Sequence, residues 1–222
     1  FTILIVQWLD SNFRKIAMVP KEYNAKGIGL FLQGYCNLYK AVCDNQHLQD
    51  AFGTQAQLMD KINELAELLI SLQSKGYSGA CWGYNFDWQA RRLFLFPKYT
   101  PTVVATCFCA TALMEAYEVT GNKRYLDIAL SSADFVVNDL HRTELKNGFL
   151  FSYSPLQGND TVYNASLLGS KLLACCYHYT GNEEYKRLAE ASVRACCNAQ
   201  NEDGSWVYGM LPVQSWIDSF HT

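Results

Sequence analysis

Three short segments of the chain place carboxylates, and in one case a histidine, among aromatic side chains. They are "WGYNFDWQARR" (82–92), "GNDTVYN" (158–164) and "SWIDSFH" (215–221). Aromatic rings can stack on the apolar face of a pyranose ring, while carboxylates accept hydrogen bonds from its hydroxyl groups. Paired carboxylates can also supply the acid and the base that break a glycosidic bond. These residue types indicate sugar recognition, provided that the fold brings the segments together.

Three residues of these segments are candidate acid–base groups, namely Asp87, Asp218 and His221. Asp218 and His221 are three residues apart, so they face the same way on a helical turn. Asp87 precedes Trp88 and lies one turn before Arg91. Each candidate also has a structural interpretation, because an Asp–Arg pair can hold a loop and an Asp–His pair can be a satisfied hydrogen bond. The sequence leaves both interpretations open.

Six residues are candidates for ligand binding, because they offer rings, a guanidinium group or a carboxylate beside the acid–base candidates. They are Tyr84, Trp88, Arg91, Asp160, Tyr163 and Trp216. Asp160 has a structural alternative, because it could be the N-cap of a helix that begins near Val162. The ligand that such a set favours is a glycan or another small molecule.

The composition argues against several classes of function. Lysine and arginine number 18 against 21 aspartate and glutamate residues, the formal charge is −3, and no basic stripe suggests nucleic-acid binding. The longest apolar run, "FTILIVQWL" (1–9), is about half the length of a membrane-spanning helix. It has neither a basic leader nor a cleavage site, so we expect no signal peptide. No dinucleotide fingerprint or phosphate-cradling glycine loop occurs, and we expect no cofactor.

The nine cysteines are interpreted as reduced thiols in the core of a cytoplasmic protein. Their number is odd, and the adjacent pairs 175–176 and 196–197 fall within helical patterns. No metal site is expected, because no C-x-x-C motif occurs and Cys107 and Cys109 would point to different faces of a helix.

An internal repeat predicts the elements that position these residues. "YEVTGNKRYLDIA" (117–129) aligns with "YHYTGNEEYKRLA" (177–189) at an offset of 60 residues. In each copy the glycine is expected to end one helix in a left-handed conformation, and the asparagine after it to cap the next helix. Thr100–Pro101 marks the expected start of the first helix of its copy. An earlier, looser copy begins at "KGIGLFLQGYCNLYKAV" (26–42).

A glycine followed by aromatic residues ends each copy, in the loops "GACWGY" (79–84), "GFLFSY" (148–153) and "GSWVYG" (204–209). Tandem helical hairpins with such regular loops predict an all-α fold, in which the hairpins form part or most of an α/α toroid. We expect one domain over 1–222 with no substantial strands. The chain starts on Phe1 and stops soon after its third loop, so the toroid is expected to be incomplete at both ends.

Two roles are expected for the aromatic residues of the first loop. Trp82 follows Gly79 at the position that Leu150 and Trp206 approximately occupy in the other loops, so it should be a buried clamp between helices. Tyr84 has no evident counterpart in the other loops and should face a central cavity.

The segment that follows is expected to reach the same cavity. Trp88, like Tyr84, has no evident counterpart in the other loops, so no clamp explains it. Trp88, Asp87 and Arg91 should be partly exposed and face the cavity. The whole segment 81–92 is predicted to be a loop that leads into a helix.

The third loop resembles a known motif. "QNEDGSW" (200–206) is similar to the Gln-x-x-x-Gly-x-Trp motif that recurs in triterpene cyclases, which are α/α barrels, and Gln73, Gly79 and Trp82 match it more loosely. The resemblance implies that Trp206 is a structural clamp between helices. The chain lacks the aspartate-rich acid motif of those cyclases and the zinc ligands of protein prenyltransferases, so neither activity is implied.

A second resemblance covers most of the chain. The segments that carry it are "GIGLFLQGYCNLYK", "CWGYNFDWQAR", "YEVTGNKRYLDIA", "GNDTVYNASLLGS" and "SWIDSFHT". They resemble a group of poorly characterised bacterial proteins encoded among capsule and exopolysaccharide biosynthesis genes, some of them labelled prenyltransferase-like. The resemblance implies a role in polysaccharide assembly, with partners in that pathway, and specifies no reaction.

Three functional hypotheses remain from the sequence. The first is a glycan-processing enzyme, similar to a hydrolase, lyase or epimerase, that uses Asp87, Asp218 and His221 as acid and base. The second is a non-enzymatic toroidal scaffold that binds a glycan or an assembly partner. The third is a protein that binds a terpenoid or polyprenyl group, which rests on analogy of fold alone.

Overall fold

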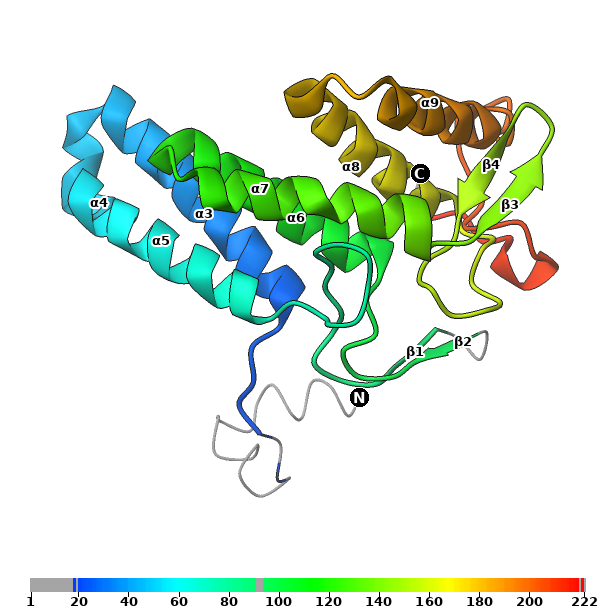
Figure 1. Cartoon of the computed structure of the whole chain (residues 1–222), viewed down its shortest axis with the longest axis horizontal. Helices are drawn as coiled ribbons and strands as arrows, with labels where there is room; N and C mark the ends of the chain where they lie inside the picture. Colours follow the sequence, from blue (N-terminus) through cyan, green and yellow to red (C-terminus); the bar gives the residue numbers. More distant parts are fainter. Residues whose placement is uncertain (1–17, 19, 91–93, 220, 222) are drawn as a thin grey trace.

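The computed structural model describes Met18 and residues 20–90, 94–219 and 221, and its elements are labelled from α3 onward as in Figure 1. The helices are α3 (Ala25–Asp44), α4 (Gln49–Phe52), α5 (Gln55–Ser71), α6 (Val103–Thr120), α7 (Lys123–Asp134), α8 (Tyr163–Thr180) and α9 (Glu183–Cys197). Short helical turns are η1 (Gln46–Leu48), η2 (Phe135–Asp139) and η3 (Pro212–Gln214). The strands are β1 (Trp88–Ala90), β2 (Phe94–Phe96), β3 (Arg142–Leu145) and β4 (Gly148–Phe151).

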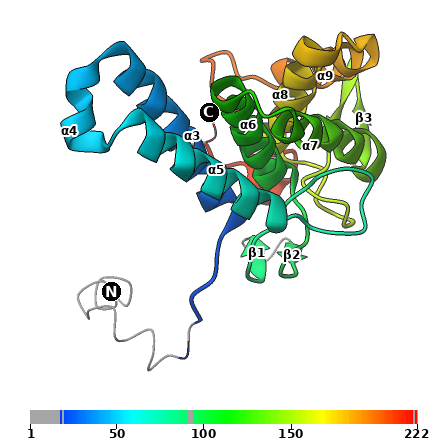
Figure 2. The ribbon, with the colours of Figure 1, turned by 60° about the vertical axis from the view of Figure 1, so that its left-hand side comes forward.

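The long helices form three successive hairpins that lie side by side (Figures 1 and 2). The first helices of the hairpins make an inner row, in which α6 packs between α3 and α8. The second helices, α5, α7 and α9, each pack on the inner helix of their own hairpin. Paired inner and outer helices in this order form part of an α/α toroid, so the predicted fold class is confirmed.

The inner helix α6 is the centre of the core. Twelve of its eighteen residues are buried, because α3, α7 and α8 surround it. Among the described helices it is also the one whose length and mean hydropathy of 1.3 would suit a membrane span, but 67% of it is buried inside the protein. Its position in the core explains an apolar surface on every side.

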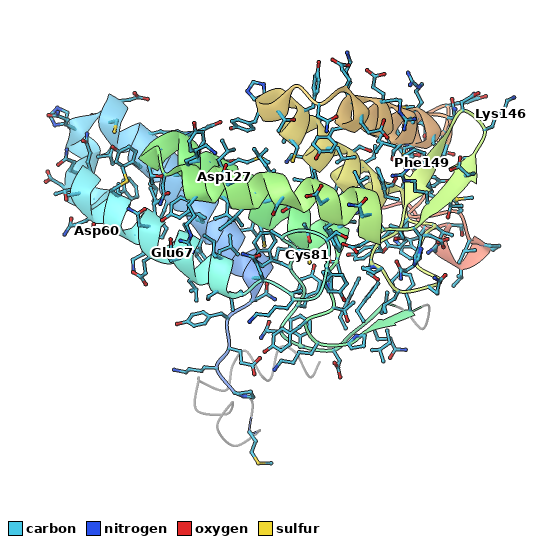
Figure 3. All side chains as sticks on the ribbon, in the orientation of Figure 1. Asp60, Glu67, Cys81, Asp127, Lys146 and Phe149 are labelled. Carbon is cyan, nitrogen blue, oxygen red and sulfur yellow. The ribbon has the colours of Figure 1, made fainter. Side chains whose placement is uncertain are left out.

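The outer helices are amphipathic, and their polar faces point away from the core. Figure 3 shows Asp60 and Glu67 on α5 and Asp127 on α7 along the outer surface. Glu67 pairs with Arg124, so an exposed ion pair links the outer helices of two successive hairpins. Exposed pairs of this kind stabilise a protein by about 1 kcal/mol at most, so packing holds the hairpins together.

The turns inside the hairpins are those that the repeat predicts. Gly121 and Gly181 end α6 and α8 in the left-handed region, with φ values of 71° and 65°. Asn122 and Asn182 then cap α7 and α9, because each side-chain oxygen accepts a backbone N–H two residues later, at 3.1 and 3.0 Å. The two copies therefore share one capping mechanism.

The start of α6 differs from the prediction. Its N-cap is Thr102, whose hydroxyl accepts the backbone N–H of Ala105 at 3.1 Å, so the helix begins after Thr100–Pro101. Pro101 instead forms an antiparallel bridge with Gly83. The first loop is thereby held against the residues that lead into the helix.

The predicted tryptophan clamp is confirmed for Trp82. Its side chain is fully buried, and its indole Nε1 donates a hydrogen bond to the Leu69 carbonyl in the last turn of α5 at 2.8 Å. Trp206 is half-buried and makes the equivalent bond to the Cys196 carbonyl in the last turn of α9, also at 2.8 Å. Each carbonyl also accepts a backbone N–H from the residue three positions later, so each indole adds a second hydrogen bond at the end of an outer helix.

The prediction that the segment 81–92 leads into a helix is wrong, and two short β-hairpins accompany the helices. The segment from Trp88 enters β1, which pairs antiparallel with β2, and the "GFLFSY" loop contains β4, which pairs with β3. Trp88 lies opposite Phe96 in the β1–β2 register, with ring centroids 5.0 Å apart and planes inclined by 12°. Cross-strand ring pairs of this kind stabilise a hairpin, and strands of only three residues leave little alternation to detect.

The β3–β4 hairpin turns at the Lys146–Asn147 tip, which Figure 3 shows at the edge of the molecule. Asn147 has a φ of 71°, a left-handed conformation that asparagine adopts more readily than most residues. Phe149 and Leu150 of β4 are buried. The hairpin is therefore an extension of the helical core at the end of α9.

The glycine of each of the first two loops lies directly against the outer helix of the following hairpin. A Cβ atom on Gly79 would lie 1.9 Å from the carbonyl oxygen of Ser131 in α7, and one on Gly148 would lie 2.0 Å from that of Ala191 in α9. Ser131 and Ala191 are 60 residues apart, the offset of the repeat. Only glycine permits this approach of loop to helix.

We predict that Gly79→Ala lowers the free energy of unfolding by about 1–3 kcal/mol, because a methyl group would force the loop away from α7. Gly34→Ala is the matched control, since a Cβ there meets nothing within 4 Å and alanine favours a helix by up to about 1 kcal/mol. Urea unfolding of both variants measures the difference. Equal effects of the two substitutions would show that this contact does not hold the loop.

Candidate functional site

A cavity of about 360 Å³ lies at the N-terminal ends of the three inner helices. Each helix contributes its second residue to the wall, Lys26 from α3, Val104 from α6 and Asn164 from α8. Val104 and Asn164 are separated by the repeat offset of 60 residues. The repeat therefore builds one end of the cavity from equivalent helix positions.

Three tyrosines, one from each glycine–aromatic loop, line the same cavity. Tyr84 and Tyr153 each come five residues after the loop glycine, and Tyr208 comes four residues after it. The expectation that Tyr84 has no counterpart in the other loops was therefore wrong. Burial raises the pKa of Tyr84 to about 12 and raises that of Tyr153 well above its usual value, so both phenols stay protonated at neutral pH.

Backbone hydrogen bonds join the tyrosines to the inner helices. The N–H of Val103, the first residue of α6, donates to the Tyr153 carbonyl at 2.9 Å. The N–H of Tyr163, the first residue of α8, donates to the Tyr208 carbonyl at 3.3 Å. The first N–H groups of a helix have no partner within the helix, so these bonds satisfy them and fix each loop over a helix end.

Stacked aromatic rings form two walls of the cavity. On the β1–β2 side, Trp88 stacks on Phe96 and lies 5.4 Å from the Tyr153 ring. On the C-terminal side, Tyr208 and Trp216 stack with centroids 4.4 Å apart and planes inclined by 16°. Such walls offer flat apolar surfaces for a sugar ring.

The C-terminal segment returns to the cavity because Gln214 anchors it. This side chain is fully buried, and its Oε1 accepts hydrogen bonds from the Thr161 hydroxyl at 3.0 Å and the Leu211 N–H at 3.1 Å. The Tyr208 N–H also donates to the Trp216 carbonyl at 3.0 Å. The anchor places the residues that follow at the cavity.

Asp218 and His221 form a close pair in this cavity. The imidazole Nδ1 lies 2.8 Å from one carboxylate oxygen and 2.9 Å from the other. The Trp216 indole donates to the same carboxylate at 3.1 Å, and the imidazole lies edge-on to the Tyr208 ring at 4.8 Å. A carboxylate at Nδ1 holds an imidazole in one orientation, as a general base requires. Proton exchange with a ligand would then use Nε2.

A buried asparagine shapes the loop that carries Tyr153. The Asn159 side chain accepts the Ser154 N–H at 2.8 Å and donates to the Leu156 carbonyl at 2.7 Å. The Tyr153 N–H donates to the Asn159 carbonyl at 2.8 Å. The loop is therefore closed by its own hydrogen bonds.

The structure brings five of the predicted site residues together in the cavity wall: Tyr84, Trp88, Trp216, Asp218 and His221. Tyr84 and Trp88 are half-buried there. Arg91 lies outside the described residues. The other three predicted residues lie elsewhere.

Asp87 is exposed, and its carboxylate accepts the Lys98 N–H at 2.7 Å instead of lining the cavity. Its orientation follows from the β1–β2 hairpin, which turns Trp88 toward the cavity. The expectation that both side chains face the cavity is therefore wrong for Asp87. A catalytic role for it stays a prediction, and it has no part in the proposal below.

Asp160 and Tyr163 are also outside the cavity wall. The Asp160 carboxylate accepts the Thr143 hydroxyl at 2.8 Å, so it ties the start of α8 to β3. The N-cap of α8 is Val162, so the alternative that Asp160 caps this helix is wrong. Tyr163 packs against the small cluster that includes Leu150, on the side of α9.

Sequence reasoning missed several residues of the wall, which are Lys26, Gln89, Val104, Tyr153, Asn164 and Tyr208. Two signals could have identified four of them. The tyrosine near the end of each loop indicates Tyr153 and Tyr208, and the 60-residue offset between two helix starts indicates Val104 and Asn164. Lys26 holds the equivalent position in α3, but the first copy of the repeat is too loose to align it with Val104 and Asn164. Gln89 carries no such signal, because it lies in β1, outside the repeated loops.

No group of three or more histidine, cysteine, aspartate or glutamate side chains could hold a metal ion within the described part of the chain. The nine cysteines are all free, and six of them are buried. Burial raises the pKa of Cys36, Cys81 and Cys107 to about 12, which keeps these thiols protonated and unreactive.

Comparisons with known proteins identify the fold. No family model matches the chain, and the curated proteins contain no match. Among solved structures, a D-mannose isomerase matches with a TM-score of 0.59 at 16% identity, over 86% of this chain and 48% of that one. A sugar epimerase from a ruminal bacterium matches with a TM-score of 0.57 at 16% identity, over 86% and 48%.

A third match is the GH76 α-mannanase BT2949 of Bacteroides thetaiotaomicron, with a TM-score of 0.56 at 16% identity, over 86% of this chain and 49% of that one. At this identity the likeness shows the fold alone, which is the α/α toroid. The chain spans about half the length of the solved structures that it matches.

We predict that Asn159→Ala lowers the free energy of unfolding by about 1–3 kcal/mol, because buried polar groups of the loop lose their partners. It should also speed hydrogen exchange at the Tyr153 amide. Gln157→Ala is the control in the same loop, since its side chain is exposed and its removal should change stability by less than about 0.5 kcal/mol. Unchanged exchange at Tyr153 would contradict the role of Asn159.

Proposed function

We propose that the protein is a carbohydrate-active enzyme that binds a sugar in this cavity and acts on it with the Asp218–His221 pair. The observation that carries the proposal is the position of this pair between two aromatic walls in one cavity. The cavity volume of about 360 Å³ is near the lower end of the usual range for small-ligand sites, which suits one sugar unit.

Binding would use the aromatic walls and the polar residues between them. Trp88 and Trp216 offer ring faces or edges to the apolar side of a pyranose, while Gln89 and Asn164 can exchange hydrogen bonds with its hydroxyl groups. The Oδ1 atom of Asn164 is buried and has no hydrogen-bond partner within the described structure. A ligand hydroxyl would satisfy this atom.

The arrangement favours proton transfer over hydrolysis of a glycosidic bond. Hydrolysis needs two carboxyl groups that flank the bond, about 5–9.5 Å apart. Asp218 is the one carboxylate that lines the cavity in the described part of the chain. A histidine oriented by a carboxylate suits the removal of a proton from the carbon next to a sugar carbonyl, as in isomerisation or epimerisation.

The proposed step moves one proton. His221 takes the proton from the carbon beside the carbonyl of the open-chain sugar. The electron pair of that C–H bond forms the C=C bond of an enediolate, while the carbonyl π pair moves onto its oxygen. Return of the proton to the former carbonyl carbon, with transfer of the neighbouring hydroxyl proton to the enediolate oxygen, gives an isomer, whereas return to the original carbon on its opposite face gives an epimer. Two of the solved structures that the chain resembles are described as a sugar isomerase and a sugar epimerase, which supports this class.

The setting that we propose is polysaccharide assembly in the cytoplasm. The resemblance to proteins of capsule and exopolysaccharide gene clusters supports the pathway. Nine free cysteines suit a reducing compartment. An isomerase or epimerase would supply such a pathway with a sugar of the required configuration.

We predict that Asp218→Asn and His221→Asn each slow deuterium incorporation at the carbon next to the sugar carbonyl by about 10²–10⁴-fold, because each variant removes the oriented base. Proton NMR in D₂O measures incorporation for glucose, mannose, N-acetylglucosamine and fructose. Asp87→Asn and Asp160→Asn are matched controls, since they make the same chemical change outside the cavity and should leave the rate unchanged.

Two results would contradict the catalytic proposal. One is a rate that falls more in Asp87→Asn than in Asp218→Asn. The other is a wild-type protein that binds a sugar and exchanges no proton, with binding lost in Trp88→Ala. The second result would support the non-enzymatic alternative, in which the cavity is a glycan-binding site only.

A further inference from the structure

Lys26 is a cation in the cavity wall without a carboxylate partner. It is half-buried at the start of α3, and its Nζ lies 4.6 Å from the centre of the Phe108 ring. Among the described residues, no acid group pairs with it and no hydrogen bond holds its ammonium group. A cation–π contact of this kind stabilises a charge by about 0.5–2 kcal/mol, less than an ion pair in a desolvated site.

Burial distinguishes Lys26 from the other described lysines. Five of these form ion pairs with acids, namely Lys40, Lys61, Lys98, Lys123 and Lys186. The four that form none, Lys21, Lys75, Lys146 and Lys171, are exposed to solvent, whereas Lys26 is half-buried. Hydrogen bonding to a glutamate raises the pKa of Lys61 and Lys98, whereas burial lowers the pKa of Lys26. The contact with the Phe108 ring offsets only part of the cost of desolvating Lys26 in the folded protein.

The surroundings of Lys26 favour an anion as the missing partner. The amino ends of α3, α6 and α8 meet at the cavity, and each carries partial positive charge. The one carboxylate of the wall within the described residues, Asp218, already accepts hydrogen bonds from the Trp216 indole and from the backbone N–H and ring of His221. A neutral sugar would leave the Lys26 ammonium without a counter-charge.

We propose that the cavity binds a sugar that bears an anionic group, either the carboxylate of a uronic acid or a phosphate, and that Lys26 binds this group. The inference rests on the proposed function and specifies the substrate class of the same site. Lys26 is then a specificity-determining residue, while Asp218 and His221 act on another part of the same sugar.

The test compares acidic and neutral members of matched sugar pairs by isothermal titration calorimetry. The pairs are glucuronate with glucose, galacturonate with galactose, and mannose 6-phosphate with mannose. We expect the wild-type protein to bind the acidic member of at least one pair roughly tenfold or more tightly, since a charge-assisted hydrogen bond contributes that much. The pair that shows the preference identifies carboxylate or phosphate as the anion.

Substitutions at position 26 test whether the Lys26 side chain causes the preference for the acidic sugar. Lys26→Met should abolish the preference and leave the affinity for the neutral sugar within about twofold, because the aliphatic stem keeps its volume. Lys26→Arg keeps a cation and should keep the preference. Lys171→Met is the control, since this exposed lysine of α8 lies outside the cavity and its loss changes the net charge equally.

Thermal unfolding shows that the variants are folded. Lys26→Met should melt at the wild-type temperature or above it at neutral pH, because it removes a desolvated charge. The inference would be overturned if Lys26→Met retained the preference for the acidic sugar. It would also be overturned if this variant lost affinity equally for the acidic and the neutral sugar. If the wild-type protein binds both members of every pair with equal affinity, the inference about Lys26 is overturned and the proposed function still stands. Binding of no sugar at all would overturn both.

Discussion

The close approach of each of the first two glycine–aromatic loops to the next outer helix is the contact on which the rest of the structure depends. Gly79 lies against Ser131 of α7 and Gly148 against Ala191 of α9, at distances that no side chain would allow. This contact joins each hairpin to the next, and it sets the path of the loop beyond the glycine. Trp82 then closes the end of an outer helix. Packing between hairpins and placement of the site thus come from the same few residues.

The site follows from this arrangement. Each loop carries a tyrosine four or five residues after its glycine, and the backbone carbonyls of two of these tyrosines accept the first N–H of an inner helix. The helix ends therefore hold the rings at the cavity, and the same geometry repeats from hairpin to hairpin. The non-repeating parts, β1 with Trp88 and the segment with Asp218 and His221, add the stacking surface and the acid–base pair. A regular scaffold thus carries an asymmetric site, as a sugar with distinct faces requires.

Much of the fold could be predicted from the sequence, because residues that recur at a fixed offset occupy equivalent packing positions in successive hairpins. The offset of 60 residues located the hairpins, and the capping residues Gly121 and Asn122 act as predicted. The strands were missed because segments of three or four residues carry too little alternation to distinguish a strand from a loop. Site residues were harder, because Asp87 and Asp160 bind Lys98 and Thr143, partners that lie 11 and 17 residues away in the chain. Local spacing cannot reveal such partners.

The central claim is that the cavity between the two aromatic walls is the place where a sugar binds and reacts. Crystals of the protein soaked separately in mannose and glucuronate would test it most directly. The account predicts electron density for a sugar between Trp88 and Trp216, with the carbon next to the carbonyl about 3–3.5 Å from His221 Nε2. A sugar bound at another surface, with this cavity filled by protein side chains, would contradict the account.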